Sequence, residues 1–497
     1  MRPWWPLVAV CLGTFMLLVD VTIVNVALPP IAASLGTSFG ALQWVIDGYA
    51  LALAALLMVT GTLADRFGRR RLYVVGLVVF ALASLACGLA PSAGALVAAR
   101  VVQGVGGAAM FATTAAILAT TYHGPRRGVA FGVWGAVNGL AAACGPLLGG
   151  LFTEAWGWRA IFLVNLPVAV VAVVLTLAVV TESASGGRAR IDVVGAATFT
   201  LASAALVYGL VSAGEDGWGA TTTVVALALA AAAVVAFVVV ERRVEAPMLD
   251  LALFADPSFA ALMVAATVLQ AAAFSHLALV SLWLQSVLGL SPIRAGLVAV
   301  PLSIASFVVS VAAGRFLHGG APARPIAGGL ALIGVGVLLM TLVGPTSGPW
   351  ALFAGLVVAG LGVGLATPVL VSATLSVLPA HRAGVGSAAV NTFRQLGLAV
   401  GLAVLGTIFA GRVAHVLAGS GVADPTGAAN ALAGGRAGQV PVASGTVHAA
   451  FASGLDTVFT VAGVAALVAA LLVAVLVRPA PAAASAPTPR PVAARSS

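Results

Sequence analysis

The chain has 497 residues, of which 61% are hydrophobic and only 7% are charged. Soluble domains carry roughly 25% charged residues, so the composition excludes an ordinary water-exposed surface and indicates an integral membrane protein. The net charge of +9 comes mostly from arginines in short segments between apolar runs, which indicates chain orientation rather than a nucleic-acid partner.

Fourteen apolar runs of about 20 residues follow one another, each long enough to cross roughly 30 Å of hydrocarbon as a helix. They predict an all-α integral membrane protein with a six-helix bundle in 1–183, an inserted helix pair in 184–256 and a second six-helix bundle in 257–478. The expected spans lie near 7–28, 44–63, 72–91, 95–119, 129–151, 160–180, 191–212, 220–240, 259–285, 294–314, 325–344, 350–377, 385–411 and 450–477.

Two stretches lie outside these spans. Residues 412–449, rich in Gly and Ala, predict a long external loop, and residues 479–497, rich in Pro and Ala, predict a disordered cytoplasmic tail. The segment 61–66 after the second span is echoed faintly at 314–318 after the tenth, which favours two related halves with a solute site between them. The first run resembles a signal peptide, but it has no obvious small-residue cleavage site and is expected to be retained.

All 23 basic residues are arginine, and their distribution orients the chain. With the N-terminus inside, seventeen lie on the cytoplasmic side, four lie outside and two lie within spans. Cytoplasmic loops typically carry an excess of basic residues, so this distribution favours a cytoplasmic N-terminus. Because the number of spans is even, both termini are predicted to be cytoplasmic. We therefore expect a multi-pass protein of the cell (plasma) membrane.

The sequence offers no motif for several other kinds of function. The three cysteines lie in apolar runs without the C-x-x-C spacing of a metal or redox site. The sequence also lacks a P-loop, a metal-ligand cluster and a nucleophile constellation, so we predict no enzyme activity, no cofactor and no metal site. Energy would then come from an ion gradient or from the solute itself, with a monomer in the lipid bilayer as the working unit.

An acid in the first span is the strongest functional signal. Asp20 lies in an apolar run, and a carboxylate at bilayer depth is costly unless it is paired, protonated or hydrated. At 1.5 Å per residue, Asp20 lies about 12 Å and Arg100 about 8 Å inside the outer ends of the first and fourth helices, so the two can share a layer. A static ion pair is the alternative, although apolar packing holds helices together more cheaply.

Four stretches form a distinctive set: Asp20–Pro29 on the first span, Gly61–Arg71 after the second, Arg100–Gly107 on the fourth, and Gly145–Gly150 on the fifth, which is followed by Trp158-Arg159 and Asn165-Leu166-Pro167. With the span count, this set resembles the major facilitator superfamily, and specifically its fourteen-helix drug:proton antiporters. The resemblance covers essentially the whole chain. It implies the major facilitator fold, alternating access and efflux driven by a proton gradient.

The loop after the second span combines charges with glycines. The resemblance implies a latch between cytoplasmic helix ends that breaks when the transporter changes state. An arginine cluster alone would anchor topology, but anchoring requires neither the aspartate nor the glycines. The residues expected in this cytoplasmic gate are Gly61, Asp65, Arg66, Gly68, Arg69 and Arg70.

The fifth span carries the block that resembles the antiporter motif: Gly145, Pro146, Gly149 and Gly150. Small residues at this spacing permit close helix approach, and proline removes a backbone hydrogen bond so that the helix can bend. The resemblance implies a gate that closes the outer side, and ordinary small-residue packing is the alternative. Ala141 stands where the family usually has glycine.

Other polar residues within spans are candidates for the proton route and the solute cavity. Asp20, Asp47 and Arg100 form the expected proton-coupling set, although Asp47 could also simply reach interfacial water. His276 is an ionisable candidate, with a neutral histidine bonded between helices as the alternative. The residues expected at the substrate cavity are Asn25, Gln103, Asn138, His276, Asn391, Arg394 and Gln395.

Together these features predict a proton-coupled antiporter that exports small hydrophobic or cationic drugs or antibiotics by alternating access. Its expected partners are the solute, protons and the lipid bilayer, and no nucleic acid. The alternatives are export of a specific metabolite such as a peptide, lipid or siderophore on the same fold, uptake by symport, and a non-transporting membrane sensor.

Overall fold

A computed structural model describes residues 3–36, 39–184, 192–215, 217–245, 247–316, 321–378, 382–433 and 442–477. Over these residues all of the regular secondary structure is helical. A helix satisfies its backbone N–H and C=O groups within one segment, which is what an apolar chain in hydrocarbon requires.

The helices of the first half and of the inserted pair follow one another along the chain. They are α1 (Trp5–Leu35), α2 (Phe39–Phe67), α3 (Arg69–Gly88), α4 (Ala93–Thr121), α5 (Pro125–Trp156), the short α6 (Ala160–Leu163), α7 (Asn165–Val179), α8 (Val193–Glu215) and α9 (Thr221–Glu241).

The second half begins with a 3-10 turn and contains one broken span. Its elements are η1 (Leu251–Ala255), α10 (Pro257–Gln270) continued by the π-helix η2 (Ala271–Ser275), α11 (His276–Leu282) and the π-helix η3 (Trp283–Val287), α12 (Pro292–Phe316), α13 (Ala323–Leu339) with η4 (Met340–Leu342), η5 (Pro349–Leu352), α14 (Phe353–Val377), α15 (Ala383–Gly419), α16 (Pro425–Ala433) and α17 (Ser444–Leu476).

The predicted fold class is confirmed. Thirteen helical segments in the described parts of the chain are long and apolar enough to cross a membrane. They correspond to all the predicted spans except 129–151, which lies within α5. That helix has 32 residues and at 1.5 Å per residue is about 48 Å long. It packs against α1 and α12 and is long enough for a fourteenth crossing.

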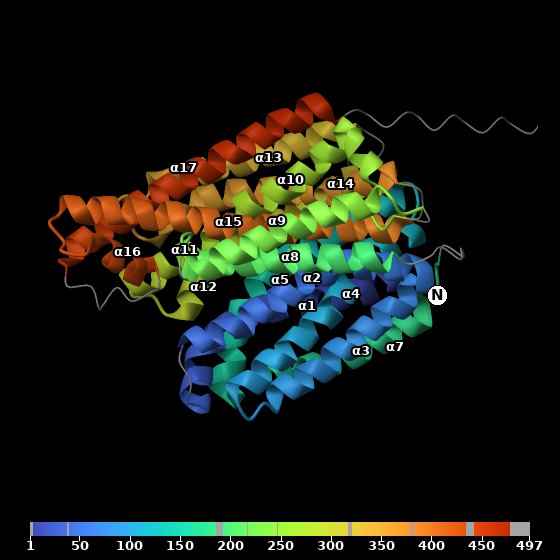
Figure 1. The fold of residues 1–497 in the computed structure, drawn as a ribbon, viewed down its shortest axis with the longest axis horizontal. Helices are drawn as coiled ribbons and strands as arrows, with labels where there is room; N and C mark the ends of the chain where they lie inside the picture. Colours follow the sequence, from blue (N-terminus) through green and yellow to red (C-terminus); the bar gives the residue numbers. More distant parts are fainter. Residues whose placement is uncertain are drawn as a thin grey trace, which may run out of the picture.

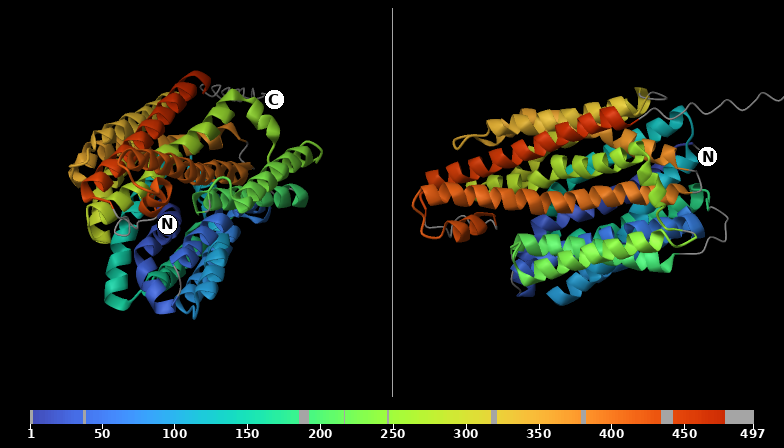
Figure 2. Two further views of the ribbon diagram at one scale, coloured as in Figure 1. Left: turned by 60° about the vertical axis from the view of Figure 1, so that its left-hand side comes forward. Right: turned by 45° about the horizontal axis from the view of Figure 1, so that its top comes forward.

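The helices form two bundles that meet along a seam (Figure 1). Within the first half, α4 packs on α2 and α3, and α1 packs on α5 and α7. Within the second, α13 packs on α14 and α17, and α15 packs on α10 and α17. The seam is made by α5 against α12 and by α2 and α4 against α15. The inserted pair α8–α9 covers one side of this seam through contacts of α8 with α2 and α15 (Figure 2).

Glycines allow the helices to pack closely within each half. A Cβ added at Gly106 of α4 would lie 2.6 Å from the backbone nitrogen of Phe80 on α3. In the second half, a Cβ at Gly336 of α13 would lie 2.3 Å from the backbone nitrogen of Ala359 on α14. Small residues thus bring neighbouring backbones into contact, as is usual when helices pack within a membrane.

The predicted external loop 412–449 is largely helical, so that prediction was wrong in its secondary structure. Helix α15 continues to Gly419, α16 covers Pro425–Ala433, and α17 begins at Ser444. Contacts of α15 with α16 and α17 stabilise these helices, although the local composition suggested a loop. The predicted tail 479–497 lies outside the described residues.

Candidate functional site

Asp20 lies at the centre of a buried hydrogen-bond network inside the first half. Its carboxylate is fully buried and accepts a hydrogen bond and ion pair from Nη1 of Arg100, which is also fully buried. Two amides donate to the other carboxylate oxygen, Gln103 Nε2 over 3.0 Å and Asn165 Nδ2 over 2.8 Å. Helices α1, α4 and α7 therefore each contribute to holding one charge.

Helix α3 closes this network from the side. Ser84 Oγ accepts hydrogen bonds from Gln103 Nε2 over 3.2 Å and from Asn165 Nδ2 over 3.0 Å, and it donates to the carbonyl oxygen of Phe162 over 2.9 Å. The hydroxyl thereby orients both amides toward Asp20. Because an unpaired polar group in this environment is costly, the packing of four helices depends on these contacts.

Arg100 has partners besides Asp20. Its Nε donates to the carbonyl oxygen of Val45 over 3.0 Å, and Nη1 also donates to Gln103 Oε1 over 2.8 Å. Its guanidinium carbon lies 4.1 Å from the centre of the Tyr49 ring, within the range of a cation–π contact. The arginine therefore keeps favourable contacts even if the carboxyl becomes neutral. The arrangement is chemically suited to a carboxyl that gains and loses a proton.

The structure groups these residues differently from the sequence analysis in one respect. The pairing of Asp20 with Arg100 is present, as expected. Gln103 was assigned to the substrate cavity, but it binds Asp20 instead, because the third residue after Arg100 returns to nearly the same side of α4. Sequence reasoning gave Ser84 and Asn165 no role in the site. Asn165 was noted only as part of the motif that follows the fifth span, without a contact to Asp20, whereas a serine among alanines carries no signal.

Asp47 lies on α2 and is half-buried. It precedes Tyr49 by two residues, or roughly 200° of rotation around a helix of 3.6 residues per turn. Since Tyr49 faces Arg100, Asp47 points toward a different side of α2. Its expected part in proton coupling stays a prediction.

The expected cytoplasmic gate joins the two halves through Asp65. Its carboxylate accepts hydrogen bonds from the backbone nitrogens of Gly384 over 2.8 Å and Val385 over 2.9 Å, at the start of α15. Arg69 binds the same carboxylate through Nε and Nη2. An acid at a helix N-terminus binds unsatisfied N–H groups and the positive end of the helix dipole. A Cβ at Gly61 would overlap Gly384, so this glycine permits the contact.

A second acid, which sequence reasoning missed, orders the start of α3. Glu182 accepts hydrogen bonds from the backbone nitrogens of Arg70 and Arg71, each over 3.1 Å. Gly68 precedes α3 with a φ of 108°, and a Cβ there would lie 2.5 Å from the Glu182 carboxyl carbon. Glycine is therefore required both for the turn and for the approach of the acid. Arg66, by contrast, is exposed, with its guanidinium over the Phe67 ring.

The glycine block of α5 lies between the halves. A Cβ at Gly145 would lie 2.7 Å from Cβ of Thr22 on α1, and one at Gly150 would lie 2.8 Å from a side-chain carbon of Ile293 on α12. Gly149 is also buried. Pro146 lies on α5, but its side chain is outside the described part of the structure. The block thus lets α5 approach one helix of each half.

Of the candidate cavity residues, those on α15 lie near the seam. Asn391 Nδ2 donates to the carbonyl oxygen of Phe111 on α4 over 3.4 Å, which joins the two halves. Arg394 donates to Asn391 Oδ1 over 3.4 Å and to Gln270 Oε1 over 3.3 Å. Gln395 is half-buried one turn after Asn391.

Besides Gln103, three cavity candidates lie on helices other than α15. Asn138 donates to the carbonyl oxygen of Trp134 within α5, and its buried Oδ1 has no hydrogen-bond partner among the described residues. His276 was assigned to the cavity, but it is packed inside the second bundle. Its Nδ1–H donates to Ala272 over 2.9 Å, and its ring lies edge-on to Phe459 of α17, 5.5 Å away. The π-helical turn before it directs it inward. The side chain of Asn25 lies outside the described residues.

No group of three or more His, Cys, Asp or Glu side chains able to hold a metal ion is present in the part of the chain that the structure describes. A membrane protein of two helix bundles, with a buried ion pair in one bundle and a contact between helix ends of the two, has the features of a transporter.

Comparison with known proteins supports the assignment to the transporters. The chain belongs to the Major Facilitator Superfamily, whose family profile matches residues 10–402. This is a family of transporters rather than enzymes.

Individual relatives are similar over most of their length. The chain is 38% identical to the multidrug resistance protein Stp of Mycobacterium tuberculosis (strain CDC 1551 / Oshkosh), covering 81% of this chain and 75% of the relative. It is 35% identical to the tetracenomycin C resistance and export protein of Streptomyces glaucescens, covering 94% and 90%. It is 38% identical to the puromycin resistance protein pur8 of Streptomyces alboniger, covering 84% of each.

A solved structure supports the fold. The crystal structure of the human organic anion transporter MFSD10 (TETRAN) superposes with a TM-score of 0.64, covering 95% of this chain and 100% of that chain. The two sequences are only 16% identical, so this likeness concerns the fold alone.

Proposed function

We propose that the protein exports small hydrophobic or cationic drugs or antibiotics from the cell in exchange for protons. The names of its relatives support drug and antibiotic export. The excess of arginines in the segments assigned to the cytoplasm supports a plasma-membrane protein with both termini inside. We further propose that it works as a monomer.

The observation that carries the coupling proposal is the fully buried Asp20, bound by Arg100 and two amides. With Asp20 ionised, the network is complete and the charge is balanced. A proton from outside would neutralise the carboxyl and weaken its bonds to α4 and α7. The helices of the first half could then shift relative to each other. Loss of the proton inside would restore the original arrangement.

The cytoplasmic gate supplies the second element of the mechanism. Asp65 binds the first turn of α15, so this contact stabilises the state in which the cytoplasmic ends of α2 and α15 are together. To admit solute from inside, this contact must break. Proton uptake at Asp20, in the middle of α1, and opening at Asp65, near the end of α2, would thus act at different depths of the first half.

The membrane potential sets the size of the gradient that one coupled charge can support. At 150 mV one charge contributes roughly 3.5 kcal/mol, since each 100 mV is worth about 2.3 kcal/mol. This corresponds to about a 300-fold concentration ratio, because 1.4 kcal/mol is about tenfold. A single coupled proton therefore suffices for useful efflux.

The proposal is tested with inverted vesicles that accumulate a fluorescent drug under an imposed pH gradient. The wild type should accumulate the dye only with the gradient, and Asp20→Asn should reduce uphill accumulation to the level without it. Asp456→Asn is the matched control, because Asp456 is an exposed acid on a spanning helix. Gradient-independent accumulation by the wild type, or undiminished pumping by Asp20→Asn, would refute proton exchange.

A narrower substrate range is the second candidate. Several relatives are named for single compounds, among them tetracenomycin C, puromycin and actinorhodin, the last for a probable transporter 37% identical to this chain. A dedicated exporter would confer resistance to one compound class in a sensitive host, whereas a multidrug pump would confer resistance to several. Susceptibility profiles of hosts expressing the wild type and Asp20→Asn distinguish the two.

A further inference from the structure

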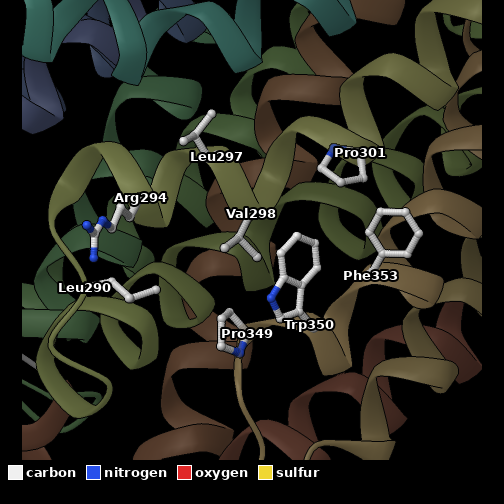
Figure 3. A pocket seen from close by; sticks show the side chains of 8 residues that line it. All are labelled: Leu290, Arg294, Leu297, Val298, Pro301, Pro349, Trp350 and Phe353. Atoms are coloured by element: carbon white, nitrogen blue, oxygen red, sulfur yellow. The ribbon is translucent and has the colours of Figure 1, made fainter.

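We propose that a groove between α12 and the start of α14 binds an anionic phospholipid, with Arg294 contacting the phosphate and an acyl chain lying along the apolar wall. The groove has a volume of about 300 Å³. Figure 3 shows its lining residues, which are Leu290, Arg294, Leu297, Val298, Pro301, Pro349, Trp350 and Phe353. Neither the pairing at Asp20 nor the gate at Asp65 involves any of these residues.

The position of the groove matches the boundary between headgroups and hydrocarbon. The apolar span of α12 begins at Ile293 and that of η5–α14 at Pro349, so Arg294 and Trp350 are each the second residue of a span. Tryptophan is enriched at this level, and arginine near a helix end extends its charge to the headgroups. From Arg294 to Pro301 the groove follows α12 for about 10 Å into the apolar region.

The chemistry of the lining favours a lipid over a transported cation. Arg294 is the one charged residue among the lining residues, and its guanidinium makes no hydrogen bond or ion pair with any residue that the structure describes. All the other lining residues are apolar. An unpaired cation above an apolar wall complements a phosphate joined to an acyl chain and repels a cationic solute.

The groove is also open toward the membrane. Trp350 is 80% exposed, Leu297 49% and Phe353 47%, although all three are large and apolar. Its volume is at the lower limit of pockets that enclose drug-sized ligands, which run from roughly 300 to 1,000 Å³. A laterally open site of this size fits one acyl chain better than a compact drug.

A lipid in this groove would lie beside the contact between α12 and the glycine block of α5. Ile293, next to Arg294, is the residue that Gly150 of α5 contacts across the seam. Further along α12, Ser306 and Ser310 lie against Gly139 and Gly135 of α5. A lipid held between α12 and α14 would therefore help to fix the position of α12 against the glycine block.

The experiment uses the full chain in nanodiscs of phosphatidylcholine containing brominated phosphatidylglycerol, or brominated phosphatidylcholine as the neutral comparison. Bromine quenches tryptophan fluorescence on contact, and the difference between wild type and Trp350→Phe isolates the signal of Trp350. Near an anionic lipid surface one arginine contributes about 1 kcal/mol, or about fivefold in affinity. We expect half-maximal quenching of Trp350 at about fivefold lower mole fraction of the anionic lipid.

Arg294→Gln should abolish this preference. Arg412→Gln, which removes an exposed arginine assigned to the same side of the membrane, should retain it. Equal quenching by both lipids in the wild type, or an unchanged preference in Arg294→Gln, would overturn the proposal. So would displacement of the quenching lipid by a transported dye at saturating anionic lipid, which would identify a solute site. None of these readouts requires transport, so the result is independent of the proposed proton coupling.

Discussion

Each half of the molecule buries an arginine deep within a span, Arg100 in the first half and Arg394 in the second, but the two arginines have different partners. In the first half, Arg100 forms an ion pair with Asp20. In the second half, Arg394 is 7% exposed and contacts two amide oxygens, those of Gln270 and Asn391. A carboxylate balances the charge of a buried guanidinium, whereas an amide offers only a dipole.

This difference shows where protonation can change the charge of the protein. Adding a proton to Asp20 changes the net charge of its network and removes the partner of Arg100. The described partners of Arg394 do not titrate, so its surroundings keep the same charge in every state. In the mechanism that we propose, the two halves therefore have different roles: proton exchange would take place in the first half, and Arg394, bonded to Asn391 at the seam, would serve the contact between the halves.

The largest effect is expected from removing each arginine in turn. Arg100→Gln leaves the Asp20 carboxylate buried without a compensating charge, which should cost about 3–5 kcal/mol of stability. Arg394→Gln removes bonds to neutral amides that glutamine can partly replace, so its cost should be about 1 kcal/mol or less. Thermal unfolding of the two variants in detergent measures the difference. Equal destabilisation would show that the two arginines have the same role and would break the comparison.

This contrast also indicates what could be predicted from the sequence. The spans follow from the length of the apolar runs alone. The pairing of Asp20 with Arg100 follows from the rise per residue of a helix, because the rise gives the depth of each residue in the membrane. The rotation of each helix about its axis does not follow from depth. Gln103 was therefore assigned to the cavity, and the contributions of Ser84 and Asn165 were not foreseen.

The next effect is expected at Asp65, the acid of the first half that binds the second. Asp65→Asn replaces a charge that accepts two backbone hydrogen bonds at the start of α15 with a neutral amide. Transport should fall about tenfold, because the loss of a charge-assisted hydrogen bond costs about 1.5 kcal/mol. Membrane insertion should stay normal.

Dye efflux normalised to the amount of inserted protein measures this loss. Arg126→Gln, which removes an exposed charge assigned to the same side of the membrane, is the control and should transport normally. If Asp65→Asn also transports at the wild-type rate, the contact with α15 is dispensable for the change of state.

A smaller effect is expected from the amide that holds Asp20. Asn165→Ala removes one of the two amides that donate to the buried Asp20 carboxylate. Dye transport should fall about fivefold, because a hydrogen bond contributes about 1 kcal/mol. Ser84→Ala should lower transport less, since both amides still reach Asp20. Unchanged transport in both variants would leave these residues with a purely structural role.

The helical segment at 412–433 shows a different limit of the sequence. Glycine and scattered polar residues suggested a loop, but α15 continues to Gly419 and packs against α16. Local composition cannot reveal that tertiary contacts will stabilise a helix beyond the membrane, whereas the length of an apolar run is a local property. The same reasoning explains why the positions of the apolar spans were predicted correctly and the loop was not.

The smallest effect is expected at His276, another ionisable group buried in the second half. Its Nδ1–H bonds to the carbonyl oxygen of Ala272 in the preceding turn, and its ring packs against Phe459. His276→Phe retains the ring contact and loses one hydrogen bond, which should cost about 1 kcal/mol. Its pH profile of transport should match that of the wild type. A shifted profile would mean that a group in the second half also exchanges protons, and proton handling would then no longer be confined to the half that contains Asp20.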